Sequence, residues 1–309
     1  ESLSSESALT RINMNLTING IPLKKSFKFP GGELNIQLPL DELNAAWCDE
    51  FVIKTILNSS DKIIELLLVT NALNHYHPEV PQKLIIHYLP YARQDRICNY
   101  GEGNNSLWFN YLLSDEYFQS VEIADVHNES TLYSFEHSST KLTHITMADI
   151  FTRNHEILNG IDLLISPDKG AKDKVSGIAH TWFIDFLCAN KDRDTETGKI
   201  NSIGFADTSN DELAIKIFDK NIMICDDIGD GCGTFVELVK QVLKFNPKSI
   251  TLYVTHGIFS KGLEILYRNG IYKIITTDSF FERKNFNGQP HEFSVDYYID
   301  KSKFKIIKL

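Results

Sequence analysis

The chain has 309 residues, 42% of them hydrophobic and 23% charged, which is ordinary for a globular enzyme and suits two domains of about 150 residues. Its formal net charge of −10 argues against a nucleic-acid-binding surface, because such surfaces rely on clustered Lys and Arg. No apolar run approaches the roughly 20 residues of a membrane-spanning helix, and the start lacks the pattern of a secretory signal. We therefore expect a cytoplasmic protein that binds no membrane.

Strand and helix patterns alternate along the whole chain. The first half predicts strand 34–38, strand 51–57, helix 62–73 capped by Asp61, strand 83–89, helix 107–113 and strand 121–124. The second half predicts strand 161–165, helix 171–180, strand 183–189, strand 221–225, a helix from Phe235, strand 250–255, helix 262–269 and strand 273–277.

Such alternation favours parallel sheets with helical crossovers. We expect an α/β fold with an N-terminal domain at 13–150 and a C-terminal domain at 151–285. Each should hold a mainly parallel sheet flanked by helices. The pattern leaves open where the tail, 286–309, is placed.

The most informative stretch is 221–245, where an apolar strand breaks at two aspartates and a glycine-rich loop leads into a helix. The loop consists of Asp230, Gly231, Cys232, Gly233 and Thr234. Converging backbone N–H groups and the helix N-terminus favour a bound phosphate there. Asp226 and Asp227 would stand beside it and can accept hydrogen bonds from neighbouring hydroxyls. This combination predicts a site for a phosphorylated sugar.

This unit resembles the phosphoribosyl diphosphate binding loop of type I phosphoribosyltransferases and of ribose-phosphate diphosphokinases. Further segments resemble the diphosphokinases in the same chain order: FPGGE at 29–33, YARQDR at 91–96, Asp-Val-His at 125–127, Ser-Pro-Asp at 166–168 and Lys-x-Arg at 191–193. The resemblance spans roughly residues 27–280.

The resemblance implies two phosphoribosyltransferase-type domains that transfer diphosphate from Mg-ATP to the anomeric hydroxyl of ribose 5-phosphate, releasing AMP. It implies ATP contacts from Phe29, Glu33, Arg93, Gln94 and Asp95. Phe29 and Glu33 would meet the adenine of a neighbouring subunit, so a homo-oligomer with a shared ATP site is expected. His127 and Asp168 would bind Mg²⁺. Lys191 and Arg193 would be catalytic, opening a mobile loop that closes over the transferring diphosphate.

The sequence departs from the family at several places. Gly31 replaces an aspartate of the adenine-contacting segment. Residues 97–105 lack the family's basic stretch and helix start, and 128–139 does not match its effector segment, so allosteric control by phosphate and ADP is not expected. Gly231 replaces a threonine of the phosphate loop, which removes a hydroxyl donor and opens space. A lost donor to a charged group costs about 1.5–3 kcal/mol. ADP-ribose, which carries a diphosphate at the 5-position, is therefore an alternative acceptor, as in a phage-type branch that serves NAD resynthesis.

Two other functions compete with this one. A non-catalytic, synthetase-associated regulatory subunit is expected to lose its catalytic cations and metal ligands, but Lys191, Arg193, His127 and Asp168 are present. A phosphoribosyltransferase that joins a base to the sugar explains the central loop and leaves YARQDR and the first domain unexplained.

Overall fold

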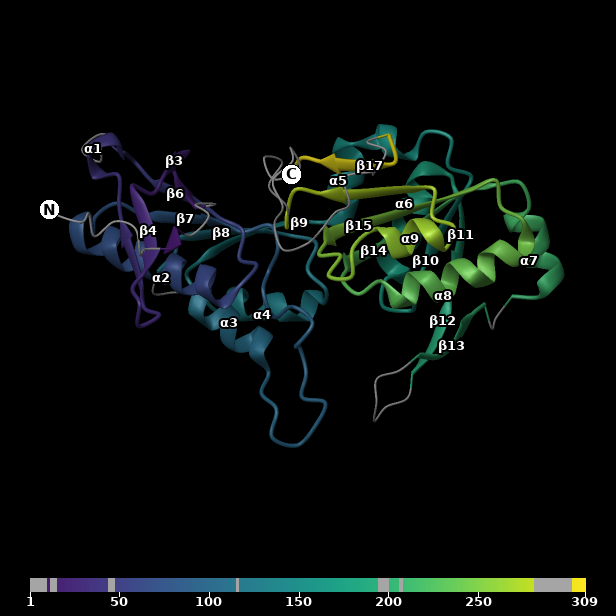
Figure 1. Cartoon of the computed structure of the whole chain (residues 1–309), viewed down its shortest axis with the longest axis horizontal. Helices are drawn as coiled ribbons and strands as arrows, with labels where there is room; N and C mark the ends of the chain where they lie inside the picture. Colours follow the sequence, from purple (N-terminus) through teal and green to yellow (C-terminus); the bar gives the residue numbers. More distant parts are fainter. Residues whose placement is uncertain are drawn as a thin grey trace, which may run out of the picture. The chain divides into compact units, whose positions relative to one another are not determined.

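The computed structural model describes residues 10–11, 16–43, 48–114, 117–193, 200–205, 208–280 and 302–309. The chain divides into two compact units, Glu1–Ile145 and Thr146–Leu309 (Figure 1). Both contain a mainly parallel sheet with helices, which confirms the predicted α/β class. None of the helices in the described ranges is long and apolar enough to cross a membrane.

The main sheet of the first unit has six strands. Their order is β3 (Ile21–Pro22), β2 (Thr17–Ile18), β6 (Phe51–Lys54), β7 (Gln82–Ile85), β8 (Ser120–Ala124) and β9 (Lys141–Ile145). The last four are parallel, whereas β2 is antiparallel to both of its neighbours. The helices of the first unit are α1 (Leu40–Leu43), α2 (Ser60–Tyr76), α3 (Asn105–Leu113) and α4 (Tyr133–Glu136), with a 3₁₀ turn at Glu129–Leu132. The sequence pattern predicts β6, β7, β8, α2 and α3 but misses β9.

A second, antiparallel sheet in this unit joins β1 (Thr10–Arg11), β4 (Lys25–Lys28) and β5 (Leu34–Gln37). The helix α2 is tied to it by charged contacts. Lys28 pairs with Asp61 at 2.6 Å. The predicted cap at Asp61 is wrong, because Ser59 has the extended backbone of an N-cap and accepts from the Lys62 N–H, so the helix begins one residue before Asp61.

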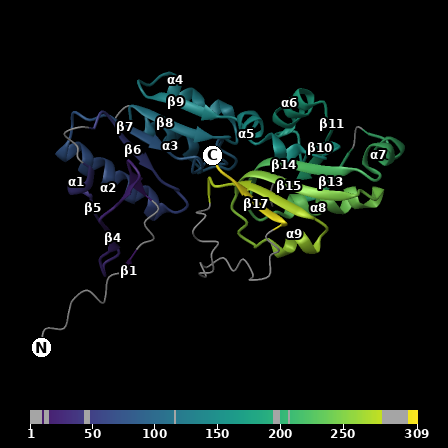
Figure 2. The same ribbon diagram turned by 90° about the horizontal axis from the view of Figure 1, so that it is seen from above.

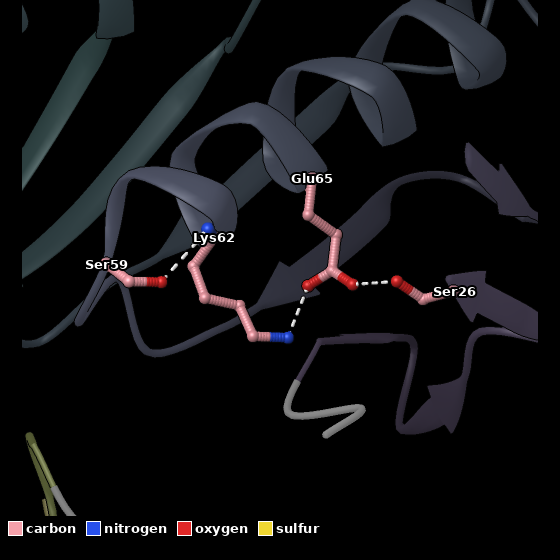
Figure 3. Close-up of polar contacts among 4 residues, drawn as sticks. All are labelled: Ser26, Ser59, Lys62 and Glu65. Atoms are coloured by element: carbon pink, nitrogen blue, oxygen red, sulfur yellow. Dashed lines mark hydrogen bonds and ion pairs between the residues drawn. The ribbon is translucent and has the colours of Figure 1, made fainter. Parts of the chain in front are cut away.

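A buried ion pair within α2 supports a hydrogen bond from the sheet to this helix (Figure 3). The Lys62 ammonium lies 2.6 Å from the Glu65 carboxylate, and their side chains are only 6% and 1% exposed. The hydroxyl of Ser26 on β4 donates to the other oxygen of Glu65. Because β4 leads directly into Phe29, this network anchors the hairpin that carries two predicted adenine contacts.

The sheet of the second unit has six strands that are all parallel. Their order is β11 (Asp185–Cys188), β10 (Leu163–Ser166), β14 (Asn221–Gly229), β15 (Ser249–Gly257), β16 (Lys273–Thr277) and β17 (Phe304–Ile307). The helices are α5 (Met147–Arg153), α6 (Lys172–Trp182), α7 (Asn210–Ile217), α8 (Gly233–Val242) and α9 (Glu264–Arg268), with 3₁₀ turns at His155–Leu158 and Leu243–Phe245. The strand β17 places the described part of the tail at the sheet edge.

Helices cover both faces of this sheet (Figure 2). On one face, Ile222 and Ile224 join a buried cluster with Leu238 of α8 and Leu266 of α9. On the other, Tyr253 packs edge-on against Phe151 of α5, with ring centroids 4.5 Å apart. Burial on both faces explains why β10, β14 and β15 are continuous apolar runs, as is typical of parallel sheets.

Two predictions about this unit are wrong. The strand β14 does not end at Cys225 but continues to Gly229, because its backbone pairs with β15 as far as Gly257. Lys191 and Arg193 do not open a loop. They lie on β12 (Asn190–Arg193), which pairs antiparallel with β13 (Ile200–Gly204) in a hairpin that projects from the sheet (Figure 1).

Candidate active site

The carboxyl ends of β10, β11, β14 and β15 meet at one edge of the second unit's sheet, the edge where open α/β sheets bind ligands. Asp168 follows β10, and Lys191 follows β11. Asp226 and Asp227 lie near the end of β14, which leads into the phosphate loop, 230–234. The parallel topology therefore gathers these predicted residues from segments that are far apart in the sequence.

The phosphate loop connects β14 to the first turn of α8. Cys232 occupies the N-cap position with a left-handed backbone (φ 58°, ψ 9°) and makes no side-chain cap hydrogen bond. A left-handed residue turns successive N–H groups toward one point, and the helix N-terminus adds partial positive charge. The first turn of α8 thus offers backbone donors to an anion instead of to a capping side chain.

The carboxylate of Asp226 interacts electrostatically with those of Asp227 and Asp168. Asp227 is buried, Asp226 is half-buried, and the Asp227 N–H donates to Asp226 Oδ1 at 2.9 Å. Burial, followed by the negative charges of Asp227 and then Asp168, raises the pKa of Asp226 well above its ordinary value. Such mutual repulsion is relieved when hydroxyl groups or a cation bind between the carboxylates.

Lys191 brings a cation directly to the phosphate loop. Its Nζ donates a hydrogen bond to Thr234 Oγ1 at 2.6 Å. The contact joins β12 to the first turn of α8, so the ammonium lies next to the predicted phosphate position. Arg193 ends the same strand, and its side chain falls outside the described part of the structure.

Lys261 also belongs to this edge, and the sequence reasoning missed it. It follows β15, and its Cε lies 3.6 Å from the position that a Cβ on Gly231 would occupy. A signal was present, because a lysine just past a predicted strand lies at the ligand edge of a parallel sheet.

The thiol of Cys232 is not a nucleophile at neutral pH. Burial and then the charges of Asp230 and Asp226 raise its pKa to about 12. The Cys232 Sγ instead donates to the carbonyl of Asp230 at 3.3 Å, which stabilises the loop.

In the first unit, the segment 91–96 forms a turn after β7, with the Gln94 N–H donating to the Tyr91 carbonyl at 2.8 Å. Asp95 Oδ2 accepts from Asn128 Nδ2 at 2.7 Å, which ties this turn to the Asp-Val-His segment after β8. Asp95 thus holds the turn, whereas Arg93 and Gln94 are exposed at its surface. The structure brings two predicted motifs together at one sheet edge.

The Asp-Val-His segment has a buried and an exposed part. Asp125 is buried and has a positive φ of 36°, and His127 is exposed. The Asn105 side chain also donates to Gln94 Oε1 at 2.5 Å, so the start of α3 supports the same turn.

Phe29 and Glu33 lie at the turn between β4 and β5, where the Phe29 N–H donates to the Glu33 carbonyl at 2.8 Å. Phe29 is 45% exposed and packs edge-on against Phe27 at 5.1 Å. Glu33 is exposed as well. This turn presents an aromatic face and a carboxylate outward from the first unit.

The two predicted metal ligands lie in different units of the chain. His127 belongs to the first unit and Asp168 to the second. Among the residues with described positions, no group of three or more His, Cys, Asp or Glu side chains is arranged to hold a metal ion. Asp168 Oδ1 accepts from the Gly170 N–H at 2.9 Å, which fixes this carboxylate at the end of β10.

No family model matches this chain, but curated proteins similar to it are known. The ribose-phosphate pyrophosphokinase of Thermococcus kodakarensis is 28% identical over 235 residues, 76% of this chain and 78% of the relative. That of Saccharolobus solfataricus is 27% identical over 278 residues, 88% and 91% of the two chains. The chain is thus similar to ribose-phosphate pyrophosphokinases over most of its length.

A solved structure shares the fold of this chain. The phosphoribosylpyrophosphate synthetase from Mycobacterium smegmatis superposes with a TM-score of 0.70, covering 92% of this chain and 85% of that one. The two are only 16% identical in sequence, so the match establishes the shared fold.

Proposed function

We propose that this protein transfers the β,γ-diphosphate of Mg-ATP to the anomeric hydroxyl of ribose 5-phosphate, giving phosphoribosyl diphosphate and AMP. The observation that carries the proposal is the contact of Lys191 with Thr234, which sets a cation beside a phosphate loop and the Asp226–Asp227 pair. A site for a sugar phosphate and a group that stabilises transferred charge thus occupy one sheet edge.

The acceptor site follows from the chemistry of each group. The first turn of α8 binds the 5-phosphate through backbone N–H groups and the hydroxyl of Thr234. Asp226 and Asp227 accept hydrogen bonds from the neighbouring ribose hydroxyls. To accept these hydrogen bonds the carboxylates must be ionised. Burial raises the pKa of Asp226, and hydrogen bonds from the ribose hydroxyls oppose this shift because they stabilise the ionised form.

The transfer is an in-line displacement. The anomeric oxygen forms a bond to the β-phosphorus, the bond from that phosphorus to the oxygen shared with the α-phosphate breaks, and AMP leaves with that oxygen while the hydroxyl proton is released. Lys191 and Arg193 neutralise charge on the transferring group, and positioning supplies most of the remaining acceleration.

ATP binds to the first unit in this proposal. Arg93 and Gln94 contact the nucleotide from the turn held by Asp95. Phe29 and Glu33, exposed on their turn, complete the adenine site of a neighbouring subunit by stacking and by accepting from the amino group. The active form is then a homo-oligomer.

Mg²⁺ is the proposed cofactor, with Asp168 and His127 as its protein contacts. The donor set fits, because the charge of Asp168 adds to the repulsion that raises the pKa of Asp226, and a cation would relieve it. Two protein ligands are enough for Mg²⁺, because this ion keeps several of its waters and binds substrate phosphates. When bound, Mg²⁺ neutralises charge on the ATP phosphates.

ADP-ribose is the second candidate acceptor, and Gly231 favours it. The backbone there does not have the positive φ that demands glycine, and a Cβ would make only ordinary contacts, with Lys261. The missing side chain therefore leaves room at the loop for a larger 5-substituent. The same transfer would then give ADP-ribose pyrophosphate.

The competing functions have weaker support. A regulatory subunit has no need for the Lys191–Thr234 contact or for the buried Asp227 beside Asp226. A base-joining phosphoribosyltransferase leaves the turn built around Asp95 without a role.

The deciding experiment measures AMP formation from Mg-ATP with ribose 5-phosphate and, separately, with ADP-ribose. Turnover with ribose 5-phosphate alone supports the first proposal, and faster turnover with ADP-ribose supports the second. Absence of AMP with both acceptors would refute both and favour a regulatory subunit.

A further inference from the structure

The loop that carries Lys261 is held firmly against the strand that leads into the phosphate loop. The N–H groups of Ile258 and Phe259 both donate to the Gly229 carbonyl at 2.8 Å. Phe259 is buried, and the Gly262 N–H closes a turn onto the Phe259 carbonyl at 2.8 Å. Lys261 therefore projects from a fixed backbone position.

The Lys261 side chain lies over Gly231. Its Cε and Cδ are 3.6 and 3.9 Å from the place of a Cβ on Gly231, and no other heavy atom outside the adjoining residues is within 4 Å of that place. The γ atoms of a threonine at 231 would extend beyond this Cβ and compete for the space along the lysine stem. The position of the Lys261 side chain therefore depends on the absence of a side chain at residue 231.

The charge of Lys261 is available to a ligand. The residue is exposed, and within the described part of the chain its ammonium forms no hydrogen bond or ion pair. Lys191, by contrast, is engaged with Thr234. The loop amides and Thr234 suit a first phosphate, and a cation over Gly231 suits an additional negative group next to it.

We infer that Lys261 binds the second phosphate of an acceptor that carries a diphosphate ester at its 5-position, and that Gly231 and Lys261 together make the site selective for such acceptors. The inference rests on the second candidate of the proposed function, ADP-ribose as the acceptor, with its 5-phosphate on the loop 230–234. It assigns the acceptor preference to two residues that lie 30 positions apart.

The test compares affinities for ADP-ribose and ribose 5-phosphate by isothermal titration calorimetry, with Mg²⁺ and α,β-methylene-ATP present. Lys261→Met keeps the stem and removes the charge, and Gly231→Thr fills the space. Lys248→Met is the matched control, since Lys248 is also exposed but precedes β15 at the opposite edge of the sheet.

We expect the wild-type protein to bind ADP-ribose more tightly than ribose 5-phosphate. Lys261→Met should raise the Kd for ADP-ribose about tenfold or more and leave that for ribose 5-phosphate within about twofold, as expected for a lost charge-assisted contact. Gly231→Thr should reduce the ratio of the affinity for ADP-ribose to that for ribose 5-phosphate. Lys248→Met should change neither affinity.

The inference would be overturned if Lys261→Met lost affinity equally for both acceptors, or if its Kd for ADP-ribose were unchanged. Parallel assays of AMP formation separate it from the proposed function. A wild-type protein that shows the expected binding preference but forms no AMP would refute the transfer reaction and still support Lys261 as the selective contact.

Discussion

The ammonium of Lys191 and the hydroxyl of Thr234, 43 residues apart in the sequence, lie 2.6 Å from each other. One comes from the hairpin strand β12 and the other from the first turn of α8. The cation is therefore in place beside the phosphate loop in the protein itself. Such preorganisation avoids reorganisation cost when charge develops in a transition state.

Replacing Lys191 by Ala should lower kcat by about 10²–10³-fold, the usual effect of removing one preorganised charge-stabilising donor. The KM for ATP should change much less, because the interaction strengthens in the transition state. Steady-state AMP formation measures both quantities. Lys248→Ala serves as a control at the opposite sheet edge, and a turnover within a few-fold of wild type for Lys191→Ala would contradict the catalytic role.

Asp226→Asn should stabilise the protein at neutral pH and abolish its activity. Because the folded-state pKa of Asp226 is raised, the folded protein binds more protons than the unfolded chain between the ordinary and the raised pKa. Stability contributed by this residue therefore falls as pH rises through that window. Asparagine keeps the oxygen that accepts from the Asp227 N–H and removes the charge.

Melting temperatures of Asp226→Asn and wild type should diverge as pH rises from about 4, where aspartate ordinarily titrates. Each 1 kcal/mol shifts the melting temperature of a domain this size by about 2–4 °C. Asp185→Asn is the control, because Asp185 is exposed at the start of β11. A lower melting temperature for Asp226→Asn at pH 7 would show that the carboxylate stabilises the fold.

Mixing two defective variants should reveal whether the ATP site is shared between subunits. Phe29→Ala/Glu33→Ala should raise the KM for ATP, since loss of one aromatic stack alone costs about 0.5–1.5 kcal/mol, or roughly 2–13-fold. Lys191→Ala should be defective in turnover. In mixed oligomers, some sites would combine the intact turn of one subunit with the intact Lys191 of another.

After co-refolding at ATP concentrations below KM, the mixture should exceed the mean activity of the two variants assayed separately. The control mixes each variant with itself under the same conditions. Activity equal to that mean would mean that each subunit completes its own ATP site. Full activity in a dilute monomer would also contradict sharing.

The buried pair of Lys62 and Glu65 should matter far more for stability than an exposed pair of the same spacing. Glu65→Leu leaves the buried Lys62 ammonium without this carboxylate, and such a change typically costs about 3–5 kcal/mol. The double variant Lys62→Met/Glu65→Leu should recover most of the loss. Urea unfolding monitored by circular dichroism measures these free energies.

Lys240 and Glu237 provide the control, because they have the same i,i+3 spacing at 2.7 Å but side chains that are 51% and 43% exposed. Lys240→Met should change the free energy of unfolding by no more than about 1 kcal/mol. If Glu65→Leu also costs less than this, the buried network does not anchor the β4–β5 hairpin.

Local patterns were sufficient to predict most regular elements. The strand Lys273–Thr277 was predicted with both ends correct, and β10, β14 and β15 were recognised from continuous apolar runs. These signals are local because burial on both faces demands apolar residues at every strand position. Ordered motifs also sufficed to indicate the family.

The sequence by itself therefore determined the α/β class, and it predicted a phosphate loop whose glycines and flanking aspartates are adjacent in the chain. Only the tertiary structure decided that β14 continues to Gly229, that Lys191 meets Thr234 and that Lys261 covers Gly231. Each of these depends on backbone pairing or side-chain contact between distant segments. Local periodicity carries no information about such distances, because chain topology sets them.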